Sequence, residues 1–208
     1  MKTWLITGCS SGLGAGIAKA VLRQGERAAI TARNPAALES LVRAYPGQAL
    51  PLLLDLNDQD SVEWTVQKTV QRFGSVDVLV NNAGHGYRAA IEESNPEAVA
   101  EIFQTNFFGP MELTRLVLPQ MRERHNGLIV NVTSIGAVRG ALGNGYYSAA
   151  KGALELASEA LAKEVAHLGI RVMVAEPGAL RTGFYGERLA DSSKTIPDYD
   201  VLAERYRK

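Results

Sequence analysis

The sequence contains little cysteine, no excess of charge of either sign and no long apolar run. Its single cysteine, Cys9, cannot form an internal disulfide, so a reducing compartment is the default expectation. Lys+Arg and Asp+Glu are balanced at 22 each, so charge gives no reason to expect nucleic acid or an anionic membrane as a partner. No segment approaches the ~20 apolar residues that span a bilayer, and the apolar run 4–6 is too short for the core of a signal peptide. These absences predict a cytoplasmic protein with neither a membrane nor a nucleic-acid partner.

The sequence does contain enough apolar material for a substantial core. Hydrophobic residues make up 46% of the 208 residues and charged residues 21%, which predicts one domain spanning residues 1–208. From residue 186 onward the chain becomes polar and loses strand character. A lid or a loosely packed tail is expected there.

Apolar segments of strand length alternate with helical patterns along the chain. The expected strands are residues 3–7, 27–32, 49–54, 76–80, 127–132 and 170–175, each a nearly continuous apolar run. The expected helices are residues 14–24, 35–44, 59–73, 96–124 and 147–168. Such strands joined by helices imply right-handed crossovers and a parallel sheet covered on both faces. The predicted fold is a single α/β domain with a doubly wound, Rossmann-type parallel sheet in three αβα layers.

Three glycines lie between the first expected strand and the first expected helix. They read Gly8-x-x-x-Gly12-x-Gly14, which differs from the better-known G-x-G-x-x-G dinucleotide fingerprint. Glycines here permit a tight turn and let backbone N–H groups approach a pyrophosphate at the positive end of the helix, and Ser10 and Ser11 add hydroxyl donors. A flexible turn would produce the same pattern. The position after a strand and before a helix favours a nucleotide.

The second expected strand ends without an acidic residue. An NAD site usually has a carboxylate at this point, which accepts from the ribose 2′-hydroxyl, whereas an arginine suits a 2′-phosphate. The residues here are Thr31-Ala32-Arg33-Asn34. Arg33 therefore favours NADP(H), and the alternative is a solvated arginine beside a helix.

A second group of polar residues follows downstream, made of Asn106, Ser134, Tyr147 and Lys151. Tyr147 and Lys151 are four residues apart, so they share one face of a helix. A nearby ammonium favours the phenolate and lowers a tyrosine pKa from ~10, which suits proton exchange with a substrate oxygen near neutral pH. Ser134 follows the fifth expected strand, where its hydroxyl would hold a substrate carbonyl or alcohol. Taken alone, a Tyr-x-x-x-Lys pair is more often an ordinary amphipathic pair.

A hydrolase and a metal site are both disfavoured by the residues. Residues 132–136 lack the first glycine of the G-x-S-x-G elbow that many hydrolases use. His85, His125 and His167 show no pairing signature, and no metal site is expected. His85 follows a strand end and is expected to line a pocket.

Together these residues resemble the short-chain dehydrogenase/reductase family. The motifs that carry the resemblance are TGCSSGLG at residues 7–14, DL at 55–56, NNAG at 81–84, Asn106, Ser134, YSAAK at 147–151 and PGALRT at 177–182. They occur in the family's order, on the expected elements, and cover the chain up to residue 182.

The resemblance implies roles for individual residues. Tyr147 would be the acid/base, Lys151 would bind the nicotinamide-ribose hydroxyls and lower the tyrosine pKa, and Ser134 would orient the substrate oxygen. Asn106 would position a water in a proton relay. The implied cofactor-binding residues are Gly8, Ser10, Ser11, Gly12, Leu13, Gly14, Arg33, Asp55, Leu56, Asn82, Ala83, Gly84, Tyr147, Lys151, Pro177, Gly178, Leu180 and Thr182.

The resemblance also implies a reaction, in which a secondary alcohol and a ketone are interconverted by hydride transfer. NADP(H) would be the preferred cofactor, with NAD(H) possible. A non-catalytic NADP(H)-binding regulatory module of the same fold is the alternative. The substrate would be a fairly apolar small molecule, surrounded by Ser134, His85, Tyr87 and Phe184 together with Ala137, Val138 and Leu142.

Two further expectations follow from the family. Members commonly form homodimers or homotetramers through two long helices, here residues 96–124 and 147–168. They also continue with a substrate-covering helix and a seventh strand, so the sheet of this chain is expected to lack its last strand.

Overall fold

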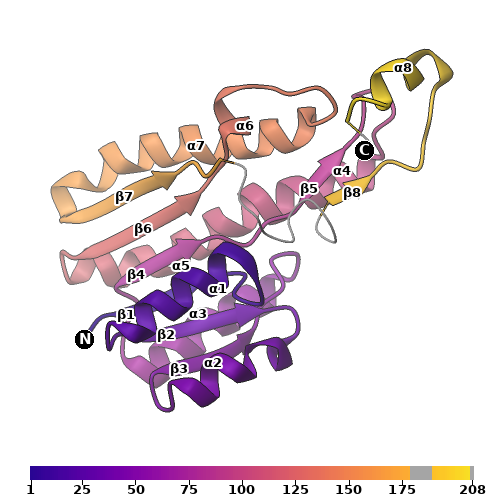
Figure 1. Cartoon of the computed structure of the whole chain (residues 1–208). Coiled ribbons are helices and arrows are strands. Elements are labelled where there is room, and N and C mark those ends of the chain that lie inside the picture. The colour runs from indigo at the N-terminus through magenta and orange to yellow at the C-terminus, as the bar shows by residue number, and fades with distance from the viewer. Residues whose placement is uncertain (179–188, 207–208) are drawn as a thin grey trace.

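The computed structural model describes residues 1–178 and 189–206, and its centre is a six-stranded parallel sheet (Figure 1). The strands lie in the order β3–β2–β1–β4–β6–β7. Their bounds are β1 (Thr3–Ile6), β2 (Arg27–Ala32), β3 (Ala49–Leu53), β4 (Val78–Asn81), β6 (Gly127–Val132) and β7 (Ile170–Ala175). The order runs outward from β1 in both directions, which confirms the doubly wound topology predicted from the alternation of strands and helices.

Helices cover both faces of this sheet. They are α1 (Gly12–Arg23), α2 (Glu39–Ala44), α3 (Gln59–Phe73), α4 (Pro96–Phe103), α5 (Gly109–Glu123) and α7 (Gly145–Val165). Successive strand residues point to opposite faces. Leu79 of β4 therefore packs in the core with α3, α5 and α7, while its neighbour Val80 packs in the core with α1 and α2. No helix in residues 1–178 and 189–206 is long and apolar enough to cross a membrane.

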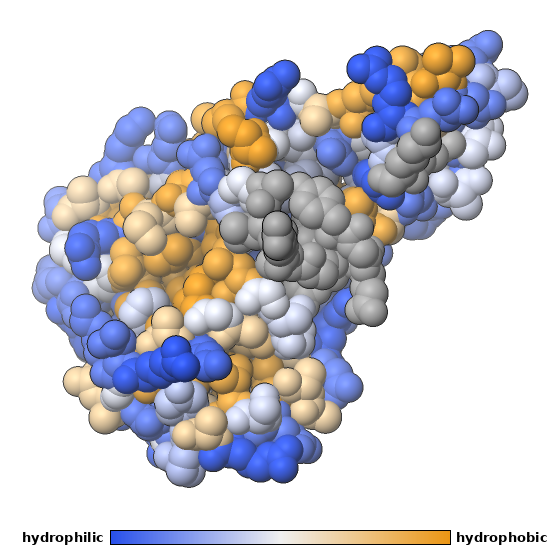
Figure 2. All heavy atoms as spheres, viewed as in Figure 1, coloured by the Kyte–Doolittle hydropathy of each residue, from blue (hydrophilic) through white to orange (hydrophobic). Residues whose placement is uncertain are grey.

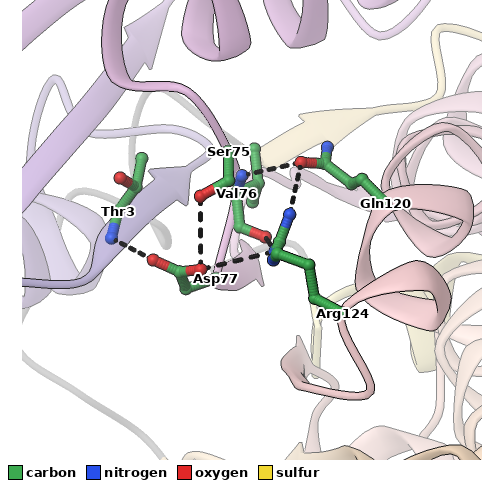
Figure 3. A network of polar contacts seen from close by, with 6 residues as sticks. All are labelled: Thr3, Ser75, Val76, Asp77, Gln120 and Arg124. Atoms are coloured by element: carbon green, nitrogen blue, oxygen red, sulfur yellow. Dashed lines mark hydrogen bonds and ion pairs between the residues drawn. The ribbon is translucent and has the colours of Figure 1, made fainter.

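Polar contacts fix the amino-terminal end of the sheet (Figure 3). The carboxylate of Asp77, just before β4, accepts from the backbone N–H of Thr3 at 2.8 Å and from the Arg124 guanidinium at 3.3 Å. Arg124 follows α5 and also donates to the Val76 carbonyl at 2.9 Å, and the Gln120 side chain accepts from the Val76 N–H at 3.0 Å. This network joins β1, β4 and α5 at one end, so the opposite, carboxyl ends of these strands lie side by side.

The predicted helix over residues 96–124 is divided in the structure. A π-helical turn, Gln104–Phe108, lies between α4 and α5, where a continuous α-helix was expected. Pro110 lacks the N–H that an uninterrupted α-helix needs at this point. The backbone hydrogen bonds therefore change from the α-helical to the π-helical spacing before α5 begins. The turn contains Asn106, whose side chain is fully buried.

The polar segment near the end of the chain does contain a strand, which corrects the expectation that it has none. Strand β8 (Leu189–Asp191) pairs in parallel with β5 (Gly86–Arg88) in a separate two-stranded sheet. A short helix, α8 (Asp200–Ala203), follows it. Residues 189–206, which we call the strap, extend beyond the main sheet together with β5 (Figure 1).

The outer part of the sheet is open on the face that carries α1. Figure 2 shows apolar side chains gathered over β6, and Met173 of β7 is 50% exposed. Within the described residues, β7 is the edge strand of the six-stranded sheet.

Candidate active site

The glycine loop lies where the carboxyl ends of β1 and β4 meet. Gly8 has a φ of +72°, in the region that favours glycine. Gly14 is packed so closely that a Cβ there would lie 2.3 Å from the Gly8 carbonyl oxygen and 2.4 Å from Nδ2 of Asn82. The loop therefore needs glycine for close packing as well as for its turn.

Residues at the end of β4 brace this loop. Nδ2 of Asn82 donates to the carbonyl oxygens of Thr7 at 2.8 Å and Gly8 at 3.2 Å. In return, the Thr7 hydroxyl accepts from the backbone N–H groups of Asn82 and Ala83 at 2.9 and 2.8 Å. The structure thus places the Asn82 amide against the loop. The role of Thr7 was missed from the sequence, although it is the first residue of the TGCSSGLG motif.

A cavity of about 250 Å³ opens beside the loop. Eight predicted cofactor or substrate residues line it, namely Gly8, Ser10, Arg33, Asp55, Leu56, Ala83, Gly84 and His85. Seven lining residues were not predicted, namely Thr31, Ala32, Leu54, Glu101, Thr105, Leu189 and Ala190. The first three lie at strand ends, and Thr105 directly precedes Asn106, so their positions carried a usable signal. Leu189 and Ala190 belong to the strap and gave none.

The remaining predicted cofactor and substrate residues that the structure describes are not among those that line this cavity. Ser11 is the N-cap of α1, and Gly12 and Leu13 form its first turn. Pro177 and Gly178 follow the end of β7. Leu180, Thr182 and Phe184 lie outside the residues that the structure describes.

Arg33 and Asp55, the two charged residues that the sequence predicts near the adenosine of the cofactor, differ in their surroundings. Arg33 is exposed and forms no ion pair with any described carboxylate. The Asp55 carboxylate accepts from both the backbone and the side-chain N–H of Asn57, at 2.9 and 3.0 Å. Arg33 therefore keeps all of its guanidinium donors for a ligand in the cavity, while Asp55 is already engaged.

Lys151 is buried with an ammonium that the protein satisfies only in part. Its Nζ donates to the Val132 carbonyl at 2.9 Å, and its other N–H groups have no acceptor among the described residues. Burial lowers the pKa of Lys151 from 10.5 to about 8, because the charged form loses its hydration. A partly satisfied, buried cation is expensive unless something else binds it.

Asn106 lies beside Lys151, across Gly84. Its Nδ2 donates to the carbonyls of His85 at 3.0 Å and Ile102 at 3.1 Å, while its Oδ1 is buried without a hydrogen-bond partner among the described residues. A Cβ on Gly84 would lie 2.5 Å from this Oδ1 and 3.4 Å from Nζ of Lys151. A side chain at residue 84 would therefore cover both polar groups, the Asn106 Oδ1 and the Lys151 Nζ, whereas glycine leaves them uncovered.

Ser134 and Tyr147 meet around Gly136. Ser134 is the N-cap of the short helix α6 (Ile135–Val138), and its Oγ accepts from the Gly136 N–H at 3.1 Å. A Cβ on Gly136 would lie 3.4 Å from the Ser134 Oγ, 3.5 Å from the Tyr147 ring and 3.3 Å from the Ser148 Oγ. Tyr147 lies one turn before Lys151 on α7. The structure therefore brings together the four predicted catalytic residues at the carboxyl ends of β4 and β6.

The predicted substrate residues are placed in different ways. His85 lines the cavity, with Nε2 3.8 Å from Glu101, and its pKa is lowered mainly by burial although Glu101 acts to raise it. Tyr87 is buried away from the cavity lining, and its hydroxyl accepts from the Asn95 N–H at 2.9 Å. Val138 and Leu142 are 63% and 48% exposed.

The residues present fit a dinucleotide. The cavity runs from the glycine loop, at the amino end of α1, past Arg33 and on to Gly84 and His85. Two buried polar atoms here have no hydrogen-bond partner among the described residues. They are Asn106 Oδ1, next to Gly84, and Nε2 of His85, the residue that follows Gly84. A ribose with hydroxyl groups is the kind of ligand that would satisfy them together with the Lys151 ammonium.

Comparisons with known proteins agree with this arrangement. The sequence profile of the short chain dehydrogenase family matches residues 2–193. Oxidoreductase BOA17 of Botryotinia fuckeliana is 38% identical, covering 100% of this chain and 77% of that protein. The 3-ketodihydrosphingosine reductase of Bacteroides thetaiotaomicron is 40% identical, over 88% of this chain but only 66% of that protein.

Solved structures lead to the same family. A short-chain dehydrogenase from Streptomyces avermitilis has a TM-score of 0.91 and 43% identity, covering 98% of this chain and 75% of that one. A metagenomic short-chain oxidoreductase in complex with NADP has a TM-score of 0.81 and 29% identity, covering 86% of this chain and 83% of that one. The family uses NAD or NADP as cofactor. The chain is an oxidoreductase that belongs to the short-chain dehydrogenase family.

Proposed function

We propose that this protein interconverts a secondary alcohol and a ketone, with NADP(H) as the preferred cofactor and Tyr147 as the acid/base. The observation that carries the proposal is the buried Lys151 ammonium, one helical turn from Tyr147 and beside the cavity that contains Gly84. A buried, partly satisfied cation favours an anionic phenolate nearby. The neighbouring Ser134 supplies a hydroxyl for the oxygen that gains or loses the proton.

The chemistry divides between cofactor and protein. The nicotinamide, when bound, supplies or accepts the hydride at the carbon that bears the substrate oxygen. In reduction, Ser134 holds the carbonyl oxygen and the Tyr147 hydroxyl gives it a proton. Lys151 would stabilise the resulting phenolate and would hold the ribose hydroxyls of the cofactor, and the Oδ1 of Asn106, which has no hydrogen-bond partner among the described residues, would accept from a water that returns the proton. The residues proposed to hold the cofactor are the glycine loop, Arg33 and the segment Ala83–Gly84.

The preference for NADP(H) rests on the end of β2. Arg33 lines the cavity and has no carboxylate partner among the described residues, so a 2′-phosphate would be its counter-ion. Strand β2 and the residue after it present no acid that would accept from a free 2′-hydroxyl. The NADP complex of the metagenomic relative supports the same choice.

The test combines binding with turnover. We expect calorimetry to detect NADPH binding and NADPH oxidation to accompany reduction of at least one member of a panel of apolar ketones. The panel begins with 3-ketodihydrosphingosine, because one relative is named for it. Tyr147→Phe should retain NADPH binding within about threefold but lose turnover by at least ~100-fold. A variant with normal turnover would refute the role of the phenol, and binding without turnover of any ketone would instead support a regulatory module.

The assembly is part of the same proposal. We expect a homodimer or homotetramer, formed through α4, α5 and α7. Phe108 at the π-helical turn and Leu156 on α7 are 53% and 68% exposed, which leaves large apolar side chains for a contact between copies.

A further inference from the structure

Glu93 is a completely buried carboxylate that the proposed reaction does not use. It lies between β5 and α4, and its exposed fraction is 0%. Its Oε1 accepts from the backbone N–H of Ile196 at 2.8 Å, and its Oε2 accepts from the Tyr206 hydroxyl at 3.3 Å. Its backbone carbonyl accepts from the Ser192 hydroxyl. All three of these donors belong to the strap.

A buried carboxylate is costly unless hydrogen bonds satisfy it. Here the hydrogen bonds come from a segment about 100 residues further along the chain. One side chain therefore holds the strap at two separated points, near its middle and at its last described residue. Removing this side chain would leave the Ile196 N–H and the Tyr206 hydroxyl without their buried acceptor, so the strap would lose a buried polar attachment.

The far end of the strap forms part of the cavity wall. Leu189 and Ala190 pair with Gly86 and Tyr87 in the small sheet, and both line the cavity together with Arg33 and the glycine loop. Pairing with β5 holds these two residues directly, and the attachment of the rest of the strap at Glu93 supports that pairing from the other end. Glu93 is thus connected to the cavity without lying in it.

Tyr206 extends the attachment to the loop before α7. A Cβ on Gly143 would lie 2.5 Å from the Tyr206 ring, and Gly143 has a φ of +75°. The ring therefore packs directly on the Gly143 backbone while the hydroxyl reaches Glu93. The strap is held between the segment that follows β5 and the loop that leads into α7.

Other polar contacts also hold the strap. Arg88 of β5 forms a bidentate ion pair with Asp191 of β8, at 2.9 and 3.1 Å, which holds the first residues of the strap beside β5. Further along the strap the remaining contacts are exposed. Lys194 donates to the Glu92 carbonyl at 2.9 Å, and Tyr199 donates to the Glu92 carboxylate at 2.8 Å. Exposed contacts of this kind contribute little because water competes for both partners. Glu92 is therefore a matched control, since it is the adjacent carboxylate and also contacts the strap, but at the surface.

We propose that Glu93 is a positioning residue that holds the strap, so that Leu189 and Ala190 stay against the cavity and slow the release of the bound dinucleotide. This inference rests on the proposed NADP(H) site for its effect on release. The attachment itself does not depend on any ligand.

The attachment is tested by hydrogen exchange of the free protein. We expect strap amides to exchange about tenfold faster or more in Glu93→Ala than in the wild type, with α1 and α7 unchanged. Glu93→Gln should restore part of the protection, because its amide oxygen still accepts from the Ile196 N–H. Glu92→Gln should exchange like the wild type. Equal strap exchange in Glu93→Ala and Glu92→Gln would overturn the inference.

The effect on the cavity is tested by stopped-flow release of NADPH. We expect release from Glu93→Ala to be about tenfold faster, with KM for NADPH raised and kcat within about twofold of the wild type. If Glu93→Ala does not fold, Tyr206→Phe removes one donor to the carboxylate but keeps the ring on Gly143, and its release should also be faster. Unchanged release despite faster strap exchange would refute the positioning role. A wild-type protein that binds neither NADPH nor NADH would refute the proposed function instead, and the exchange data would still decide whether Glu93 holds the strap.

Discussion

Replacing Lys151 by methionine should stabilise the fold at neutral pH while it abolishes turnover. Burial lowers the pKa of Lys151 from 10.5 to about 8, and each pKa unit corresponds to about 1.4 kcal/mol, so the charge costs the folded state about 3 kcal/mol at pH 7. Methionine fills a similar volume without a charge. It loses the hydrogen bond to the Val132 carbonyl, which offsets about 1 kcal/mol. The net expected gain is about 2 kcal/mol.

The sign of this effect depends on pH. Between pH 8 and 10.5 the folded wild type binds fewer protons than the unfolded chain, so its stability rises as the pH increases through this window. Lys151→Met has no such titration. Above pH 10.5 the wild-type side chain is neutral in both states, and the lost hydrogen bond should leave the variant about 1 kcal/mol less stable. The two stability curves should therefore cross.

Urea unfolding of both proteins between pH 6.5 and 11, followed by circular dichroism, measures this difference. A gain of about 2 kcal/mol at pH 7 should also raise Tm by about 4–8 °C. Lys163→Met is the matched control, since Lys163 is exposed on the same helix, and its effect should stay within about 0.5 kcal/mol at every pH. A Lys151→Met protein that is less stable at pH 7, or a difference that does not change with pH, would refute the reasoning.

Two further substitutions test the cofactor site and the loop. Arg33→Ala should weaken NADPH binding by about 10- to 100-fold, through loss of a charged hydrogen bond, and NADH binding by less than about threefold. Calorimetry of both dinucleotides, with exposed Arg43→Ala as control, decides this, and equal losses would remove the 2′-phosphate assignment. Gly14→Ala should lower the unfolding free energy by about 1–3 kcal/mol, because its Cβ would meet Gly8 and Asn82 at 2.3–2.4 Å. Gly16→Ala on the same helix has open space around its Cβ and should be neutral or stabilising in the same thermal melts, so similar effects of the two changes would contradict the packing argument.

Much of the main sheet was predictable from local pattern alone. The inner strands β1, β2 and β4 are buried on both faces, so their apolar runs are nearly continuous and can be recognised without knowledge of their neighbours. The π-helical turn at Gln104–Phe108 was not predicted, because the helical periodicity of residues 96–124 does not reveal a change of hydrogen-bond spacing. Pro110 marked the position, but proline is also acceptable in the first turn of an ordinary helix.

The strap was beyond local prediction for a different reason. Its strand β8 is only three residues long and pairs with β5, about 100 residues earlier in the chain, so its sequence carries no periodic signal. Glu93 likewise reads as one of two adjacent acids in a polar loop, and only tertiary structure distinguishes it from the exposed Glu92. The glycine loop and the Tyr147–Lys151 pair were predictable because each is local, with its spacing fixed by a single turn or helix.

Buried polar atoms without hydrogen-bond partners do not by themselves identify the end of the sheet that carries the candidate active site. Thr3 Oγ1 and Arg27 Nε, at its amino end, lack hydrogen-bond partners among the described residues just as Asn106 Oδ1 does. The carboxyl end differs because its unsatisfied atoms lie beside Gly84 or on His85, both of which line the cavity, and because a buried charge, Lys151, whose burial opposes folding, also lies beside Gly84. Ionisable groups whose pKa is shifted by burial are concentrated at functional sites, where the charge acts on a ligand or on another catalytic group. The stability gained by Lys151→Met therefore measures how much folding free energy is spent on holding that ammonium beside Tyr147.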